Sequence, residues 1–322
     1  MSTTRPRWPA TLAARLGLLV ATLAAESMLL FGALQLMPGD AASTVLGTNA
    51  TPASMAAFRR RLGLDHNLAV RYGEWIGHAL TGNLGTSTQS GQSVTSVIAQ
   101  PLLDTLILAG IAGALIVVCS LAIGIVAGVR PGSRTDTGLS TGTLLVVSVP
   151  AFVFASVLAI VFAGVLHLLP AASLLPFGGT PLTQPDILVL PALSLVIFGT
   201  AWASRLVRAA VADATVLPHV EAARLAGLPL SRVLVRHLLP ETVGPCAQAF
   251  AWLTTLLVGG TVVVEQIYSY PGLGQVLVTA VRDHDTPVVE AVGLLIVAVV
   301  TVAFVLADAV TVLTNPKLRE ER

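Results

Sequence analysis

Lysine, which contacts phosphates in nucleotide-binding loops and forms Schiff bases, is almost absent from this chain of 322 residues. The chain has one lysine, Lys317, and no GxxxxGK[ST] loop, in which a lysine contacts nucleotide phosphates. We therefore expect neither ATP cleavage by this route nor Schiff-base chemistry. The six histidines lack metal-ligand spacing, which predicts that the chain alone holds no metal site: His66, His78, His167, His219, His237 and His284.

Two acidic residues lie within apolar segments, where ionisable groups are functional hypotheses by default. Glu26 is at the middle of the run Leu16–Leu36, and a proton-coupled carrier would use such a group. A single mid-segment acid without a nearby basic partner favours the other interpretation, an acid that faces the interior of a helical bundle. Asp308 interrupts the apolar run Val292–Leu313 near its predicted cytoplasmic end, where we expect it to face lipid headgroups or to pair with Arg205 or Arg208.

The composition places these residues in a membrane. Hydrophobic residues make up 54% of the chain and charged residues 11%, against about 25% charged in soluble domains. The mean hydropathy is +0.83 and the net charge +1, which excludes disorder, a coiled coil and a basic nucleic-acid-binding surface. Cys119 and Cys246 both fall in apolar runs, and we expect no disulfide between them.

Six apolar segments have the length needed to cross a bilayer, about 20 residues as a helix. The fold class predicted is therefore all-α integral membrane, with six transmembrane helices. The first segment also has the shape of a signal peptide, but its apolar run resumes at Ser27, which favours a retained span. The segments are Leu16–Leu36, Leu106–Val129, Leu139–Leu169, Ile187–Leu206, Thr242–Val264 and Val292–Leu313.

Arginine and lysine in short loops predict the orientation, because they concentrate on the cytoplasmic side. If the six spans alternate, thirteen fall on one side, which makes both termini cytoplasmic: Arg5, Arg7, Arg15, Arg130, Arg134, Arg205, Arg208, Arg224, Arg232, Arg236, Lys317, Arg319 and Arg322. The other side has five, of which four lie in a loop long enough to escape this rule: Arg59, Arg60, Arg61, Arg71 and Arg282.

The predicted organisation has four parts. The long external loop contains an amphipathic helix around Leu68–Leu80, which would pack on the rim of the bundle or dock a partner. The parts are the cytoplasmic N-terminus with the first span (1–37), the extracytoplasmic loop (38–101), a five-helix core (102–313) that includes a cytoplasmic loop (217–240), and a cytoplasmic tail (314–322).

The cytoplasmic loop Leu217–Pro240 has the signals of two short helices. Glu221 adds negative charge to the first turn of one helix, and Gly227 is placed to end it in the left-handed conformation. A second helix over Ser231–Leu238 is expected to stop before Pro240. Such a pair forms a rigid knob that a soluble partner could bind.

This loop resembles the EAA loop of ABC-importer permeases, and further segments resemble the dipeptide/oligopeptide and nickel permease group. In that family the loop forms the coupling helix, which contacts the ATPase subunit. The resemblance implies this coupling role for the residues that match the motif: Glu221, Ala222, Ala223, Gly227, Leu239 and Pro240. The resemblance extends from about Leu36 to Arg319, although His219 stands where the family usually has an aromatic residue. The segments are Leu34–Asp40, Arg61–Ser87, Ser148–Phe154, Leu190–Leu193, Pro271–Val289 and Asn315–Arg319.

The resemblance implies a translocation subunit of a type I (MetI-like) importer in the inner membrane, most often for peptides. Its partners would be a second homologous permease in a heterodimer, two cytoplasmic ATPase domains and an extracytoplasmic solute-binding protein. ATP and Mg²⁺ would bind the ATPases, so this chain would be no enzyme and hold no cofactor. Nickel or another metal chelate is an alternative substrate.

Four residues within the spans are possible pathway positions. Ser148 and Pro150 would kink the third span beside the pore or only pack it, and Gly259 and Gly260 would permit close helix packing or line the pathway. A stand-alone ion-coupled carrier and an intramembrane enzyme are the rival functions. The carrier would need Glu26, and the enzyme would need a catalytic cluster that the spans do not contain.

Overall fold

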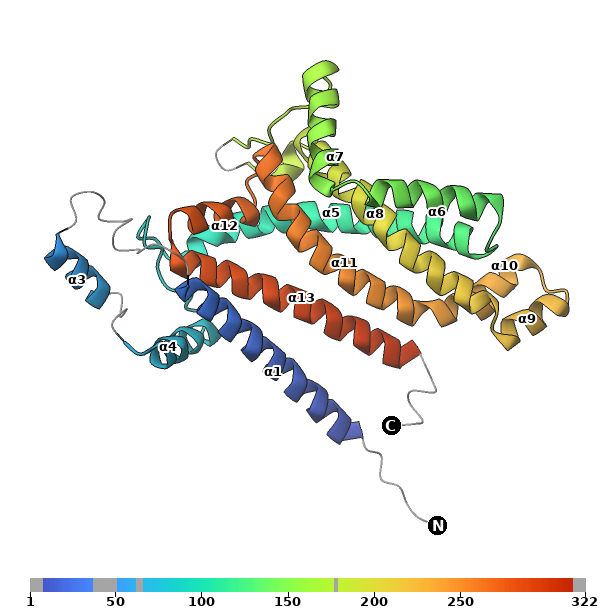
Figure 1. Cartoon of the computed structure of the whole chain (residues 1–322), viewed down its shortest axis with the longest axis horizontal. Coiled ribbons are helices and arrows are strands. Elements are labelled where there is room, and N and C mark those ends of the chain that lie inside the picture. The colour runs from blue at the N-terminus through green and yellow to red at the C-terminus, as the bar shows by residue number, and fades with distance from the viewer. Residues whose placement is uncertain (1–7, 37–50, 62–65, 177–178, 315–322) are drawn as a thin grey trace, which may run out of the picture. The chain divides into compact units, whose positions relative to one another are not determined.

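The computed structural model describes residues 8–36, 51–61, 66–176 and 179–314 (Figure 1). The described residues are mostly helical, and their only β-pairing is a single bridge between Thr86 and Ser93. This confirms the all-α prediction. Some segments named above lie outside the described residues: Arg5, Arg7, the end of the Leu34–Asp40 match, the start of the long loop, and the tail with Lys317.

The chain divides into two compact units. The larger unit comprises Met1–Gly17, Leu106–Tyr270 and Val300–Arg322, and the smaller unit comprises Leu18–Thr105 and Pro271–Val299. Three long helices contribute residues to both units: α1 (Trp8–Gln35), α5 (Val94–Gly128) and α13 (Thr286–Thr314).

Helix α8 is central to the larger unit. It packs against α11 most extensively and also against α6 and α7. Tyr268 is fully buried in this core, where its hydroxyl donates to the Ala155 carbonyl at 2.7 Å and lies 3.1 Å from the Ser194 hydroxyl. The helices concerned are α6 (Arg134–Val147), α7 (Ala151–Leu158), α8 (Asp186–Thr215) and α11 (Leu239–Tyr268).

Two glycines allow α5 and α8 to approach closely. A Cβ on Gly124 would lie 2.6 Å from the Val207 Cβ, and a Cβ on Gly128 would lie 2.7 Å from the Val211 Cβ. The contact partners advance by four residues on each helix, so α5 and α8 run in the same direction. Consequently, the turn that follows α5 and the loop that follows α8 lie at the same end of the larger unit.

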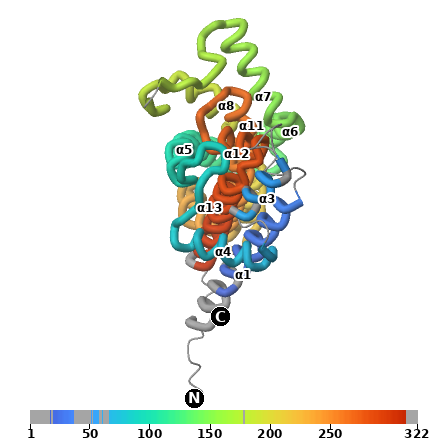
Figure 2. The backbone as a smooth tube through the Cα atoms, turned by 90° about the vertical axis from the view of Figure 1, so that its left-hand side faces the viewer, coloured from blue at the N-terminus to red at the C-terminus, as the bar shows by residue number. Residues whose placement is uncertain are grey.

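The smaller unit packs helix α4 (Leu68–Leu80) beside α1, as Figure 2 shows. Phe31 of α1 stacks on Trp75 of α4 with ring centroids 5.8 Å apart, and the Tyr72 hydroxyl lies 2.8 Å from the Ser27 hydroxyl. The helix predicted around Leu68–Leu80 is therefore confirmed, and it packs against α1. The other helices of this unit are α3 (Pro52–Arg61) and α12 (Leu273–Arg282).

Four described helices are long and apolar enough to cross a membrane, and a bent pair would make a fifth. The first predicted span is helical as α1, but the apolar part identified within it, Val20–Gln35, is shorter than a full span. The count of six spans therefore stays a prediction. The four helical segments are Val94–Gly128, Asp186–Thr215, Leu230–Tyr268 and Thr286–Val312.

The third predicted span is wrong as one continuous helix. Instead of Leu139–Leu169, the chain forms α6, then α7 with a π-helical continuation over Ala159–Val165, and the two parts meet at 86°. The break falls at Ser148–Pro150 because proline lacks a backbone N–H and pushes the residue before it out of the helical region. The kink predicted for Pro150 is thus a sharp bend between two helices.

Candidate coupling element and transport pathway

Helix α9 (Pro218–Leu225) begins where the loop sequence predicts, with Pro218 in its first turn. Its inner face is buried, because Val220 and Ala223 join an apolar cluster that includes Val207 and Val211 of α8. Its outer face is exposed and carries Glu221, Ala222, Arg224 and Leu225. One side of this short helix is therefore packed against α8, and its other side is exposed.

Gly227 ends α9 in the left-handed conformation, as predicted, with φ of +74°. Its N–H donates to the Arg224 carbonyl at 3.0 Å, and the N–H of Leu228 donates to the Ala223 carbonyl at 3.3 Å. These two bonds form a Schellman motif, which satisfies carbonyls at the helix end. Any side chain here would strain the backbone and change the angle at which the chain leaves α9.

The second predicted helix does not stop before Pro240. Helix α10 (Leu230–Val233) continues through a π-helical turn, Leu234–Leu238, into α11, so that the helix runs from Leu230 to Tyr268. The π turn accounts for the continuity: the wider hydrogen-bond spacing before Pro240 accommodates a ring without an N–H. Leu239 and Pro240 thus belong to the base of α11, with Leu239 half-buried and Pro240 exposed.

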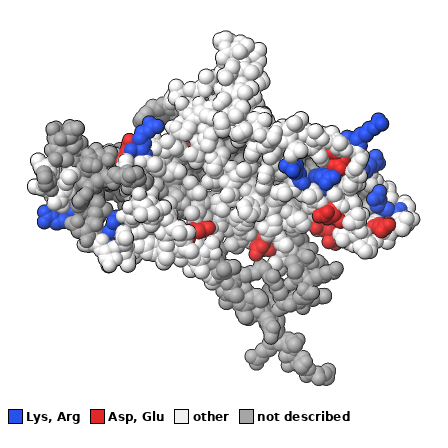
Figure 3. Space-filling view, viewed as in Figure 1, with Lys and Arg blue, Asp and Glu red and all other residues white. Residues whose placement is uncertain are grey.

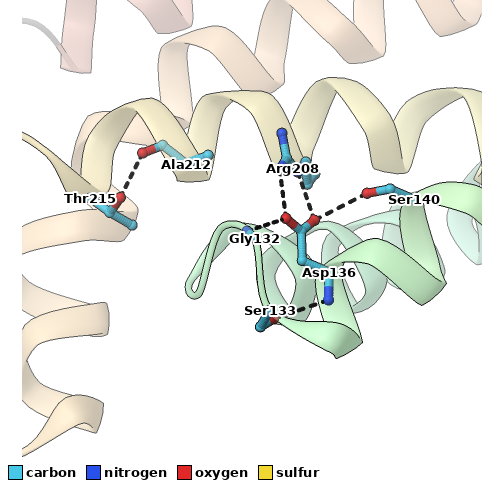
Figure 4. A network of polar contacts seen from close by, with 7 residues as sticks. All are labelled: Gly132, Ser133, Asp136, Ser140, Arg208, Ala212 and Thr215. Carbon is cyan, nitrogen blue, oxygen red and sulfur yellow. Dashed lines mark hydrogen bonds and ion pairs between the residues drawn. The ribbon is translucent and has the colours of Figure 1, made fainter.

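A buried carboxylate ties the turn after α5 to α8 (Figure 4). Asp136, in the first turn of α6, accepts two bonds from Arg208, from Nε at 2.9 Å and from Nη2 at 2.6 Å. It also accepts the Gly132 N–H at 2.8 Å and the Ser140 hydroxyl at 3.1 Å. Bidentate pairs of this kind fix orientation as well as adding energy. These bonds hold α6 against α8, the helix to which α9 is attached.

Charged residues of the larger unit cluster at the end that carries α9 and α10. Figure 3 shows acidic and basic atoms clustered over the region of α9 and α10, whereas the surface over α7 is uncharged. Within the described part of the chain, the exposed Glu221 carboxylate forms no hydrogen bond or ion pair. Its charge is thus free to meet a basic partner. His219, also on α9, lies 3.5 Å from Glu241 at the base of α11.

The two candidate pathway glycines border a cavity of ≈470 Å³ between α8 and α11. A Cβ on Gly259 would meet open space, whereas one on Gly260 would lie 3.2 Å from the Leu195 side chain. Trp202, Trp252 and other mostly apolar side chains form the remaining wall, together with the hydroxyl-bearing Ser194 and Thr255. Gly259 therefore opens the cavity rather than packing a helix contact, and the pathway role stays a prediction.

The other candidates lie at separate places. Ser148 and Pro150 are exposed at the bend between α6 and α7, and the Ser148 hydroxyl donates to the Leu145 carbonyl at 2.7 Å. Of the two interpretations of Asp308, the pairing with Arg208 is wrong, because Arg208 pairs with Asp136. Asp308 is exposed and accepts a bond from the Gln248 amide at 3.1 Å, and its position facing lipid headgroups stays a prediction. Cys119 and Cys246 are free thiols.

Sequence reasoning missed the groups that hold α5 and α6 against α8 at this end of the larger unit. Asp136 lies outside the apolar runs, and nothing in its spacing indicates which arginine it meets. Gly124 and Gly128 had a readable signal, since small residues four apart in a membrane helix typify close helix contacts. Among the described residues, no cluster of three or more His, Cys, Asp or Glu side chains could hold a metal ion.

The sequence profile of the binding-protein-dependent transport system inner membrane component matches residues 120–320, well over half of the chain. The profile of the N-terminal part of such components matches residues 11–109. This chain belongs to that family. It is an ABC importer permease of the peptide/nickel group, and its helical fold is that of MetI-type permeases.

The names of relatives of the permease refer to two kinds of cargo. A protein of Brucella abortus, provisionally named a peptide transport system permease, is 31% identical over 91% of this chain and 93% of its own length. A Brucella ovis protein with a similar provisional name is 34% identical over 92% and 95%. The metal-staphylopine import system permease of Staphylococcus aureus is 30% identical over 84% and 85%.

The solved structures support the fold of the permease. An inward-facing structure of the MetNI methionine ABC transporter matches with a TM-score of 0.54 and 18% identity. The match covers 68% of this chain and 96% of the other. A second crystal form of that transporter gives a TM-score of 0.55, with coverage of 67% and 95%. At this identity, the likeness concerns the fold alone.

Proposed function

We propose that the permease forms half of a peptide pathway across the inner membrane, with both termini in the cytoplasm. A second homologous permease forms the other half. Two cytoplasmic ATPase domains bind ATP and Mg²⁺ and hydrolyse the ATP, and an extracytoplasmic solute-binding protein delivers the substrate. Membership of the importer family supports this assembly, because family members work with such partners.

The geometry of α9 carries the coupling part of the proposal. The helix buries Val220 and Ala223 in the core and presents Glu221 and Leu225, the latter 82% exposed. A rigid helix with a free carboxylate and an unburied apolar side chain suits a groove on a soluble partner. Because α9 is fixed to α8 and leads into α11, movement of the partner would be transmitted to the helices that line the pathway cavity.

Of the candidate substrates we favour peptides, because several relatives are provisionally named peptide permeases. The uncharged, aromatic wall of the α8–α11 cavity is compatible with varied side chains and selects none strongly. A metal chelate is the second candidate, favoured by the metal-staphylopine relative. Uptake of a radiolabelled tripeptide and of a nickel chelate by cells expressing the complete transporter distinguishes them.

The coupling role is tested with Gly227→Val and Glu221→Lys. Both variants should insert and retain the second permease, while uptake falls strongly and ATPase subunits are lost or hydrolyse ATP without transport. Gly82→Val is the matched control, because Gly82 has the same left-handed backbone, φ of +80°, and open space around its Cβ. It follows α4 in the smaller unit, whereas α9 belongs to the larger unit, and its substitution should leave ATPase binding unchanged.

Three results would count against this proposal. If both α9 variants are abundant, keep their ATPases and transport normally, the loop is not a coupling element. If the chain alone accumulates substrate in vesicles with a proton gradient, and Glu26→Gln abolishes this, the carrier function is correct instead. Loss of the chain from the membrane in both variants, with the control intact, would indicate a purely structural loop.

A further inference from the structure

A second cavity, of ≈690 Å³, lies between α6 and α8 at the end of the larger unit where α9 is attached. One wall is a stripe on α6 that includes Thr137, Thr141 and Leu144, at helical spacings of four and three residues. The other is a stripe on α8 that includes Trp202 and Arg205. The two helices therefore border an open cavity with both hydroxyl and apolar lining.

The cavity is polar at one end and apolar at the other. The Asp136–Arg208 ion pair marks the polar end. Leu144 lies eight residues after Asp136 on α6, and Trp202 lies six residues before Arg208 on α8. Both positions lie from the ion pair towards the apolar parts of the two helices. Tryptophan is enriched where a membrane meets water. This arrangement matches an amphiphile whose head binds near Arg208 and whose tail extends past Trp202.

The charge of the cavity is close to one positive unit. The guanidinium of Arg208 is neutralised by the Asp136 carboxylate, which is nearly fully buried. Arg205 is exposed and forms no hydrogen bond or ion pair within the described part of the chain. Its guanidinium and the hydroxyls of Thr137 and Thr141 are therefore donors that face the cavity without an acceptor among the described residues.

We propose that this cavity binds the phosphodiester headgroup of an anionic phospholipid such as phosphatidylglycerol. Arg205 contacts the phosphate, and the Thr137 and Thr141 hydroxyls donate to its oxygens. Basic pockets between membrane helices on the cytoplasmic side bind anionic lipid headgroups in this way. One phosphodiester carries one negative charge, which matches the net charge of the cavity. The apolar wall of Leu144 and Trp202 distinguishes a lipid from a free phosphate or a peptide carboxylate.

The test uses the purified full-length chain in detergent and native mass spectrometry. Phosphatidylglycerol is titrated against phosphatidylcholine, and bound lipid is counted for the wild type, Arg205→Gln and Arg205→Lys. One arginine near a membrane surface contributes enough that Arg205→Gln should weaken phosphatidylglycerol binding about fivefold. Arg205→Lys keeps the charge and should retain most of the affinity. Arg232→Gln, at an exposed arginine of α10 that does not line the cavity, is the matched control and should change nothing.

Each outcome supports or overturns the proposal. Preference for phosphatidylglycerol that falls in Arg205→Gln alone supports it. Equal binding of both lipids, or an equal loss in the Arg232→Gln control, overturns it. Displacement of the lipid by millimolar inorganic phosphate would identify a free-phosphate site, and displacement by a tripeptide would identify a substrate carboxylate site. Either displacement overturns the lipid assignment.

Discussion

Alanine substitutions at Gly124 and Gly128 should loosen the contact between α5 and α8. The added Cβ atoms would lie 2.6 and 2.7 Å from valine Cβ atoms, and 2.9 and 2.8 Å from the carbonyl oxygens of Ser204 and Arg208. Carbon atoms in contact normally lie about 3.5–4.0 Å apart, so each overlap approaches 1 Å. The atoms that are hit belong to the backbone or sit next to it, so no side-chain rotation relieves the clash and the helices must separate.

The size of the effect follows from two opposing contributions. Overpacking costs about 1–3 kcal/mol, and this site belongs at the upper part of that range because it is rigid. Alanine is the better helix former by about 1 kcal/mol, which offsets part of the loss. We therefore expect each substitution to lower the free energy of unfolding by about 1–2 kcal/mol. Gly110→Ala on the same helix is the control, because its Cβ would meet nothing within 4 Å.

The assay follows thermal unfolding of the purified permease through reaction of Cys246 with a thiol-reactive fluorophore. This thiol is 7% exposed in the folded chain and becomes reactive when the larger unit opens. Gly124→Ala and Gly128→Ala should unfold several degrees below the wild type, and Gly110→Ala at or above it. Wild-type stability in both variants, or an equal loss in Gly110→Ala, would refute the close approach of α5 and α8.

Two further predictions concern the ion pair and the topology. Asp136→Asn should destabilise the permease by about 1–3 kcal/mol, because it removes the charged acceptor of Arg208, whose side chain is 34% exposed and therefore still partly solvated. Asp136→Asn with Arg208→Gln should lose less than the sum of the single variants, and additive losses in chemical unfolding would contradict the pairing. With Cys119 and Cys246 replaced, an impermeant thiol reagent applied to intact cells should label single cysteines at Arg71 and Thr180 but not at Arg232, since positive charge marks the cytoplasmic side; the reverse pattern would overturn the orientation.

Local signals in the sequence predicted local structure well. Gly227 has a left-handed backbone where the pattern of the loop required a helix to end, and Leu68–Leu80 is a helix because its apolar residues recur at helical spacing. Such features depend on a few neighbouring residues and their backbone preferences, which the sequence states directly. The family resemblance rested on similar short segments and was confirmed by the profile matches.

Features that depend on distant residues could not be predicted in the same way. Hydropathy counts apolar residues and contains no information on the direction of a helix axis. The prediction from hydropathy therefore treated α6 and α7 as one span across the 86° bend at Pro150. Pro240 was expected to end a helix, but the π-helical turn Leu234–Leu238 lets the helix continue past this proline. The partner of Arg208 depends on how α6 crosses α8, and spacing along the chain carries no information on that crossing.

The attachment of an ATPase to α9 is the central claim, and site-specific cross-linking tests it most directly. A photoreactive group would be attached to a single cysteine at Leu225, on the exposed face of α9, in a chain without Cys119 and Cys246. Leu80 at the end of α4 is the control, because both leucines are 82% exposed and only one belongs to the proposed coupling element. Illumination of the assembled transporter in membranes should link position 225 to an ATPase subunit and leave position 80 unlinked to it. Absence of the ATPase cross-link at 225, in a complex that transports normally, would contradict the account.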